Sequence, residues 1–406
     1  MAGVQGEITL RSGQHEDAPV VVYVQQLLEQ AVALRASDLH FEPYESHYRV
    51  RMRIDGQLQE VSSAPAGFRG RLAARIKVMA RLDVAEKRLP QDGRARLCLP
   101  DGRELDLRVS TLPTLFGEKV VVRVLDAQQV RLDLQALGYE ARDLALLTQA
   151  IHRPHGMVLV TGPTGSGKTQ SLYACLHRLN TAEVNIATVE DPCEIQIEGI
   201  NQVNVQDKPG LSFAVVLRAF LRQDPDILMV GEIRDLETAQ IAIQAAQTGH
   251  LVLSTLHTND APATLVRLRN MGVANYNIAA SVSLITAQRL VRRLCLHCRE
   301  PLPMSPETLQ QAGMPPRLLP QGEVQVYRPR GCNLCHRGFR GRTGIFQVMP
   351  VSAAMQSLIL AEAGAQDFER QATLEGVRSL REAGLHQVLA GVTSLDEVLA
   401  ATREQA

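Results

Sequence analysis

One stretch constrains the fold of this chain more than any other, and it reads Gly162-Pro163-Thr164-Gly165-Ser166-Gly167-Lys168-Thr169. It follows an apolar run at 157–160 and precedes a helix-compatible run at 170–174. Strand, glycine-rich loop and helix in this order are the context of a phosphate-binding loop, whose glycines turn backbone N–H groups toward one anion. We therefore expect these residues to bind a nucleoside triphosphate, with Lys168 at the β- and γ-phosphates and the Thr169 hydroxyl on Mg²⁺. A chance match in a glycine-rich turn is the alternative, and both flanks disfavour it.

Composition excludes several classes of protein. The 406 residues leave room for roughly two to four domains, and 45% hydrophobic with 21% charged residues favours buried cores over global disorder. Basic and acidic residues number 43 each and Trp is absent, so neither an overall field nor stacking platforms indicate nucleic acid. No apolar run approaches the ~20 residues of a transmembrane helix, and no signal-peptide pattern opens the chain. We expect a cytoplasmic protein with no nucleic-acid partner and no transmembrane segment.

The first part of the chain has the pattern of a small mixed domain. Residues 1–18 are polar and are predicted to be a flexible lead. Helical spacing of apolar residues follows, and then strands in which apolar residues alternate with arginines, as over 48–54. Two hairpin turns are predicted, the first at Asp55-Gly56. We infer a small α+β (PAS-like) domain over residues 19–130.

The strands of this domain are rich in arginine, with Arg94, Arg96, Arg103, Arg108 and Arg123 among the examples. A solvated strand face is the usual fate of such charges. The alternative is that some of them reach the triphosphate of a neighbouring subunit, because the guanidinium fork pairs with phosphate oxygens at two points. Both interpretations stay open from the spacing alone.

Beyond the glycine-rich loop, helical stretches alternate with short apolar runs at 186–189, 227–230 and 251–256. This alternation predicts a doubly wound parallel sheet, and thus a P-loop α/β domain over residues 131–290. Ligands of such sheets bind outside the carboxyl ends of the strands. Because Glu190, Glu232 and His257 each follow one of these runs, we expect them to converge with Lys168 on one nucleotide.

Hydrolysis needs a carboxylate that orients or deprotonates water. Glu232 is the first candidate for this role. Glu190 is the second, either on Mg²⁺ through water or sharing the base function. Each carboxylate has the alternative of capping the helix that follows it. His257 has two open interpretations, a structural histidine or a sensor of the γ-phosphate.

The cysteines Cys295, Cys298, Cys332 and Cys335 form two Cys-x-x-Cys pairs. Four thiolates are a tetrahedral set for Zn²⁺, so residues 291–345 are predicted to be a zinc module with a structural ion. His297 and His336 are adjacent and could substitute as ligands, although four thiolates suffice. Residues 346–406 have helical spacing, and we predict a C-terminal helical region without direct chemistry.

These motifs together resemble the GspE/PilB family of ATPases, which serve type II secretion and type IV pilus assembly. The resemblance covers about residues 17 to 400. Its pieces are Ser37-Asp38-Leu39-His40-Phe41-Glu42-Pro43, Arg53-Ile54-Asp55-Gly56, Pro90-Gln91-Asp92-Gly93-Arg94, Ser110-Thr111-Leu112-Pro113-Thr114, Gly117-Glu118-Lys119-Val120-Val121, the Walker A loop, Thr188-Val189-Glu190-Asp191-Pro192, Gly231-Glu232-Ile233-Arg234-Asp235 and Ser254-Thr255-Leu256-His257-Thr258-Asn259.

The resemblance implies a homo-hexameric ring of RecA-like motors that hydrolyses ATP with Mg²⁺ and acts with an inner-membrane platform protein. Arg108 and Arg123 match the arginines that reach the nucleotide from the N-terminal domain. Within the family, segments such as 168–173 favour the pilus-assembly members, and the cysteine tetrad argues against the retraction type. Type II secretion, DNA uptake, or a low-turnover assembly or regulatory subunit are the alternatives.

Two departures from the family pattern are visible. Typical members begin with an additional N-terminal domain, whereas this chain begins almost directly at the next one, as expected of a truncated or a naturally short member. Gly231 also stands where many P-loop proteins carry Asp. That is usual for this family, and it makes Glu232 the acidic residue expected to act.

Overall fold

The computed structural model describes residues 18–99, 101–125, 132–206, 210–319 and 321–403. The predicted flexible lead, residues 1–18, lies outside these ranges except for its last residue. The chain divides into two compact units, residues 1–130 and 131–406, which we describe separately.

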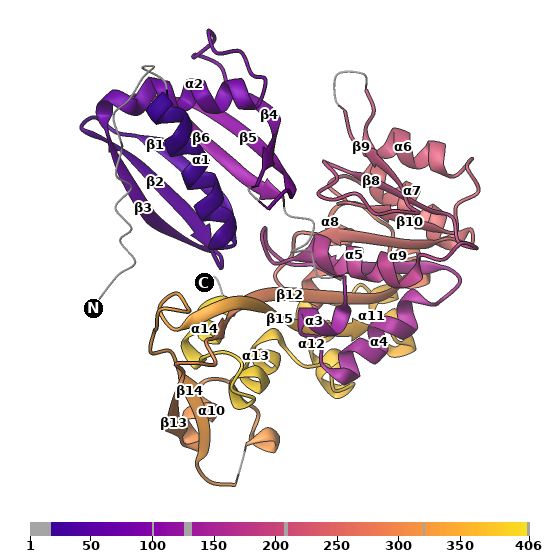
Figure 1. The fold of residues 1–406 in the computed structure, drawn as a ribbon. Helices are drawn as coiled ribbons and strands as arrows, with labels where there is room; N and C mark the ends of the chain where they lie inside the picture. The colour runs from indigo at the N-terminus through magenta and orange to yellow at the C-terminus, as the bar shows by residue number, and fades with distance from the viewer. Residues whose placement is uncertain (1–17, 100, 126–131, 207–209, 320, 404–406) are drawn as a thin grey trace. The chain divides into compact units, whose positions relative to one another are not determined.

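The first unit contains one antiparallel sheet of six strands in the order β3-β2-β1-β6-β5-β4 (Figure 1). The strands are β1 (Ala36–Pro43), β2 (His47–Ile54), β3 (Gln57–Pro65), β4 (Gln91–Cys98), β5 (Glu104–Thr114) and β6 (Gly117–Leu125), and the helices are α1 (Ala18–Ala33), η1 (Ala66–Phe68) and α2 (Arg69–Met79). Side chains of α1 and α2 form one core cluster with inward-facing residues of the six strands. The predicted helix, both hairpins and the α+β class are therefore present, while β1 and α2 had not been predicted.

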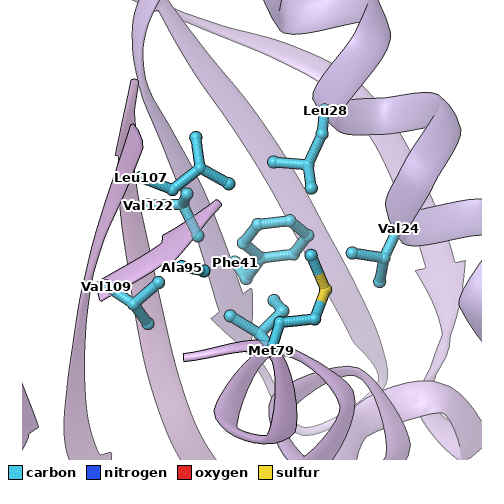
Figure 2. A pocket seen from close by; sticks show the side chains of 9 residues that line it. Val24, Leu28, Phe41, Met79, Ala95, Leu107, Val109 and Val122 are labelled. Atoms are coloured by element: carbon cyan, nitrogen blue, oxygen red, sulfur yellow. The ribbon is translucent and has the colours of Figure 1, made fainter. Parts of the chain in front are cut away.

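Figure 2 shows an apolar pocket inside this unit, between the two helices and the sheet. Phe41 lies among aliphatic side chains and Met79, and every lining residue is apolar. Because the lining offers no titratable group, we assign no chemistry to it.

The second unit is built on a seven-stranded sheet in the order β15-β12-β7-β11-β10-β8-β9. Its strands are β7 (Gly156–Thr161), β8 (Ile186–Glu190), β9 (Asn201–Asn204), β10 (Ile227–Val230), β11 (Leu251–Leu256), β12 (Val282–Leu294) and β15 (Phe339–Pro350). All neighbours pair in parallel except β15, which runs antiparallel to β12. The parallel strands thus bring their carboxyl ends to one edge.

Helices cover both faces of this sheet, as a doubly wound fold requires. Met157 and Leu159 of β7 belong to a core cluster with α6, α7, α8, α9 and later helices. Val158 and Val160 belong to the cluster with α4 and α5 on the other face. The helices are α3 (Leu134–Leu137), α4 (Ala141–Ile151), α5 (Lys168–Leu179), α6 (Phe213–Phe220), α7 (Leu236–Gln247), α8 (Ala261–Asn270), α9 (Asn275–Ser281), α10 (Pro306–Gln311), η3 (Pro316–Leu318), α11 (Ala353–Leu360), α12 (Ala365–Leu374), α13 (Leu380–Leu389) and α14 (Leu395–Ala401).

The cysteine-bearing segment is inserted between two paired strands of the sheet. The predicted limits at 290/291 and 345/346 fall inside β12 and β15, which pair from Leu284↔Pro350 to Leu294↔Phe339. The prediction that 346–406 is helical from its start was therefore wrong for the first residues, since helices begin at Ala353. Both strands are mostly buried, so neither has the alternating pattern that identifies a half-buried strand.

The insertion shares a small core with two of the C-terminal helices. It contains a two-stranded sheet of β13 (Glu300–Met304) and β14 (Val324–Arg328), together with α10. Met304, Leu309 and Val326 pack with Leu385 of α13 and Val398 of α14. In the part of the chain that the structure describes, no helix is both long enough and apolar enough to cross a membrane.

Candidate functional site

The glycine-rich loop joins the end of β7 to the start of α5, as predicted. Gly162, Gly165 and Gly167 have φ values of 148°, 79° and 89°, a region that favours glycine. A Cβ on Gly162 would lie 2.5 Å from the carbonyl oxygen of Gln288. No side chain fits there, so this loop keeps its backbone free to turn around an anion.

The Lys168 side chain folds back over the loop. Its Nζ donates to the carbonyl oxygens of Gly162 over 2.8 Å and Pro163 over 3.1 Å, and the residue is 8% exposed. Burial lowers the pKa of Lys168 to about 8, against the opposing charge of Glu232. The ammonium group is thus held at the loop by neutral carbonyls, which anionic phosphate oxygens can replace. Thr169, in contrast, is exposed in the first turn of α5.

Glu232 lies after β10 in a group of charged side chains. His257 Nε2 lies 3.2 Å from Glu232 Oε2, and Arg234 forms an ion pair with Glu232 and, over 3.4 Å, with Asp191. Burial works to raise the pKa of Glu232, but the hydrogen bond and charge of Arg234 and the neighbouring His257 outweigh it and hold that pKa below the ordinary value. The carboxylate is therefore ionised at neutral pH.

Glu190 ends β8 and has a different environment, because it is 3% exposed and held by neutral donors. The hydroxyl of Tyr173 donates to Oε2 over 2.5 Å. Thr188 Oγ1 and Gln202 Nε2 donate to Oε1 over 2.7 and 3.3 Å. The two acidic candidates thus have different surroundings. Glu232 is partly exposed and forms ion pairs, whereas Glu190 accepts hydrogen bonds from two hydroxyls and an amide.

The strand ends and the loop are joined by buried polar contacts that the sequence had not indicated. Gln288 of β12 donates to the carbonyl oxygen of Ser166 and accepts from the Ser171 hydroxyl, both over 2.8 Å. Thr161 of β7 contacts the hydroxyl of Thr258, directly after His257, over 2.5 Å. The local sequence contains no clear signal for Gln288, because Ser283 and Thr286 already interrupt the apolar residues before it, and finding its partners requires the tertiary fold.

The structure places Arg108 and Arg123 directly opposite each other on β5 and β6 of the first unit. Arg123 Nε donates to Asp38 Oδ1 over 3.0 Å, so one arginine already has a carboxylate partner. Their approach to a nucleotide stays a prediction.

The four cysteines come together, although Cys295 and Cys332 are 37 positions apart in the sequence. Their sulfur atoms all lie within 4.8 Å of one another, with Cys295–Cys332 at 3.9 Å and Cys298–Cys335 at 3.6 Å. A tetrahedron with about 2.3 Å from zinc to sulfur has sulfur–sulfur edges of about 3.8 Å. The cluster therefore fits a four-thiolate ion, and all four cysteines are free of disulfides.

Comparison with known proteins gives a consistent set of relatives. Residues 13–400 match the family described as type II/IV secretion system protein. The chain is 53% identical over 389 residues to the type IV pilus assembly ATPase PilB of Acinetobacter baylyi, covering 96% of this chain and 67% of that protein. It is 48% identical over 388 residues to the type II secretion system protein E of Xanthomonas campestris, covering 96% and 68%.

Solved structures support the fold. The ATPase DotB of Legionella pneumophila aligns with a TM-score of 0.69 at 20% identity, covering 93% of this chain and 95% of that one. The pilus retraction motor PilT, determined with bound ADP, aligns with a TM-score of 0.61 at 23% identity, covering 94% and 97%. At such identities the likeness concerns the fold alone.

Proposed function

The chain belongs to the type II/IV secretion system protein family, and from this premise we propose that it is an ATP-hydrolysing motor that powers type IV pilus assembly. The observation that carries the proposal is a complete phosphate-binding loop whose lysine interacts electrostatically with Glu232, the acidic residue that follows β10. The names of three relatives support the pilus as client, because these proteins are called PilB and are 51–53% identical to this chain. We further propose a homo-hexamer that works at the cytoplasmic face of the inner membrane with a platform protein.

Nucleotide binding would use the backbone of residues 162–169. The N–H groups of the loop and of the first turn of α5 would donate to one anion, and Lys168 would exchange the carbonyls of Gly162 and Pro163 for phosphate oxygens. Thr169, exposed beside them, supplies a hydroxyl ligand to Mg²⁺, which neutralises charge on the phosphates when bound.

Hydrolysis would use the strand ends. Glu232 orients the attacking water, since it is ionised and lies near Lys168. His257 senses the γ-phosphate and transmits its presence to Glu232 through their contact. Glu190 binds a water near the metal or shares the role of the base. We propose Arg108 and Arg123 as further catalytic residues, because guanidinium groups neutralise charge on phosphate oxygens.

We also propose a fold type for each part of the chain. The second unit is RecA-like, the first is a PAS-like domain, and the cysteine-bearing insertion is a zinc module. Four thiolates leave no open position, so Zn²⁺ would be structural and take no part in hydrolysis.

The test is phosphate release and nucleotide binding by purified, assembled protein. Lys168→Ala should abolish ATP binding, because the loop loses its only cationic side chain. Glu232→Gln should bind ATP and turn over at least about a hundredfold more slowly, the usual effect of losing a base. Equal phosphate release by the parent and Lys168→Ala would remove the ATPase proposal, and rapid turnover by Glu232→Gln would reassign the carboxylate.

Type II secretion is the second candidate, because relatives named type II secretion system protein E are 47–49% identical. Capture experiments with pilus and secretion platform proteins distinguish the two clients. A third possibility, a low-turnover assembly subunit, predicts ATP binding by the hexamer without sustained phosphate release.

A further inference from the structure

Tyr173 connects the phosphate-binding helix to the end of a neighbouring strand. It lies on α5 four residues after Thr169, so the two side chains leave the helix on the same face. The residue is 1% exposed. Its hydroxyl donates to Glu190 Oε2 over 2.5 Å and accepts from the backbone N–H of Glu194 over 3.1 Å. One phenol therefore joins α5, the end of β8 and the loop after it.

The direction of this hydrogen bond is set by the phenol. Burial, together with the Glu190 carboxylate, raises the pKa of Tyr173 far above its ordinary value. The hydroxyl therefore keeps its proton at neutral pH and is the donor of the hydrogen bond to Glu190.

The acceptor sites of Glu190 can be counted. An ionised carboxylate offers about four acceptor sites, two on each oxygen. Thr188 and Gln202 fill both sites on Oε1, and they come from β8 and β9, within the sheet itself. Tyr173 fills one site on Oε2 from outside the sheet. Among the described residues, the acceptor site without a donor is therefore on the oxygen that Tyr173 holds.

Resting on the proposed ATPase function, we propose that Tyr173 is a positioning residue for hydrolysis. Its hydroxyl directs the remaining acceptor site of Glu190 Oε2 toward the carboxyl edge of the sheet, where it accepts a hydrogen bond from a water of the nucleotide site. Because Tyr173 and Thr169 share one face of α5, the same helix places both the metal-binding hydroxyl and this carboxylate.

The competing view is that Tyr173 only ties α5 to β8. A structural tie predicts a loss of stability or of nucleotide affinity when the hydroxyl is removed. A positioning residue predicts that turnover falls while binding and folding persist. It also predicts that the hydroxyl has no effect once the carboxylate is gone, since Tyr173 acts through Glu190 alone.

The experiment uses four variants of the full chain: Tyr173→Phe, Glu190→Gln, the double variant and Tyr48→Phe. Tyr48→Phe is the matched control, because Tyr48 is also fully buried and its hydroxyl has no partner among the described residues. We measure kcat, the Kd of a non-hydrolysable ATP analogue and the unfolding temperature. Tyr173→Phe should lower kcat about tenfold, as expected for one hydrogen bond to a charged group, with Kd unchanged. The double variant should match Glu190→Gln.

Three results would overturn the positioning role. The first is an unchanged kcat in Tyr173→Phe, and the second is a loss of nucleotide affinity large enough to explain the lower activity. The third is a kcat of the double variant that falls by the product of the two single losses. The Lys168→Ala comparison keeps the two proposals apart. If the parent hydrolyses ATP and Lys168→Ala does not, failure of the Tyr173 arms removes this inference and leaves the ATPase standing.

Discussion

The nucleotide end of the large sheet and the cysteine pairs are both identified by short motifs, but different forces hold them in place. The loop at 162–169 is fixed by its glycine conformations, by Gln288 and by the strand on each side. The cysteines lie on two short turns, joined to each other mainly by sulfur contacts and by the hydrogen bond from Cys295 to Gly338. The first site is organised by the fold, whereas we propose that the second depends on a bound ion for its stability.

Removing the ion should therefore have the largest effect of any change considered. Structural Zn²⁺ contributes apparent binding free energies of about 10–16 kcal/mol in small domains, and four unbound thiols have no comparable attraction. Cys298→Ser should lose about one zinc per chain by elemental analysis, and proteases should cut the insertion while the sheet resists. Nucleotide affinity should persist.

The matched control is Cys98→Ser, which alters an exposed cysteine of the first unit. If the metal-free Cys298→Ser protein assembled normally and resisted proteases like the control, the zinc assignment would be wrong and the comparison between the two sites would fail.

The nucleotide end should respond differently, with a smaller and local loss. Gln288 is 2% exposed and bridges Ser166 and Ser171. Gln288→Ala leaves two buried polar groups without partners, at about 1–3 kcal/mol each. We expect the free energy of unfolding to fall by about 2–6 kcal/mol in denaturant titrations, with weaker ATP binding and unchanged zinc content.

Gln244→Ala controls for loss of a glutamine, because Gln244 is exposed on α7. Equal stability of the two variants would show that the loop is fixed by its own backbone rather than by β12.

This contrast also explains which features of the molecule could be predicted from the sequence. Residues 162–169, the strands before Glu190 and Glu232, and the four cysteines all lie in local patterns. The structure contains the predicted loop and the two parallel strands, and it brings the four cysteines together. Gln288 and its partner Ser166 are 122 positions apart, and Tyr173 meets Glu190 across two elements. Such pairs are defined by tertiary packing, and the spacing of residues along the sequence does not predict them.

The ends of elements were predicted least well. The insertion was expected to begin at 291 and the helical region at 346, yet β12 and β15 pass through both positions. A strand buried on both faces shows neither alternation nor helical spacing, so its limits become visible only through its partner. The roles of Arg108 and Arg123 are a different case, because they depend on how subunits meet, and they stay predictions.

The smallest predicted effect concerns the protonation of Lys168, and it tests whether the loop is organised before nucleotide binds. Burial lowers the pKa of this lysine to about 8 in the free protein, whereas phosphate oxygens favour its charged form. Below that pH the lysine is charged in both states, so affinity for ATP is highest there. Above it, binding must take up a proton, and affinity should fall by up to about tenfold per pH unit.

Calorimetry at pH 9 in two buffers of different ionisation enthalpy should detect proton uptake approaching one per ATP. The unfolding free energy of the free protein should rise over the same pH interval, because the lysine of the unfolded chain keeps its proton to a higher pH. If the affinity for ATP were constant from pH 7.5 to 9.5, Lys168 would be solvated until the nucleotide binds. The phosphate-binding loop would then be no more ordered before ATP binds than the cysteine pairs are before a metal ion binds.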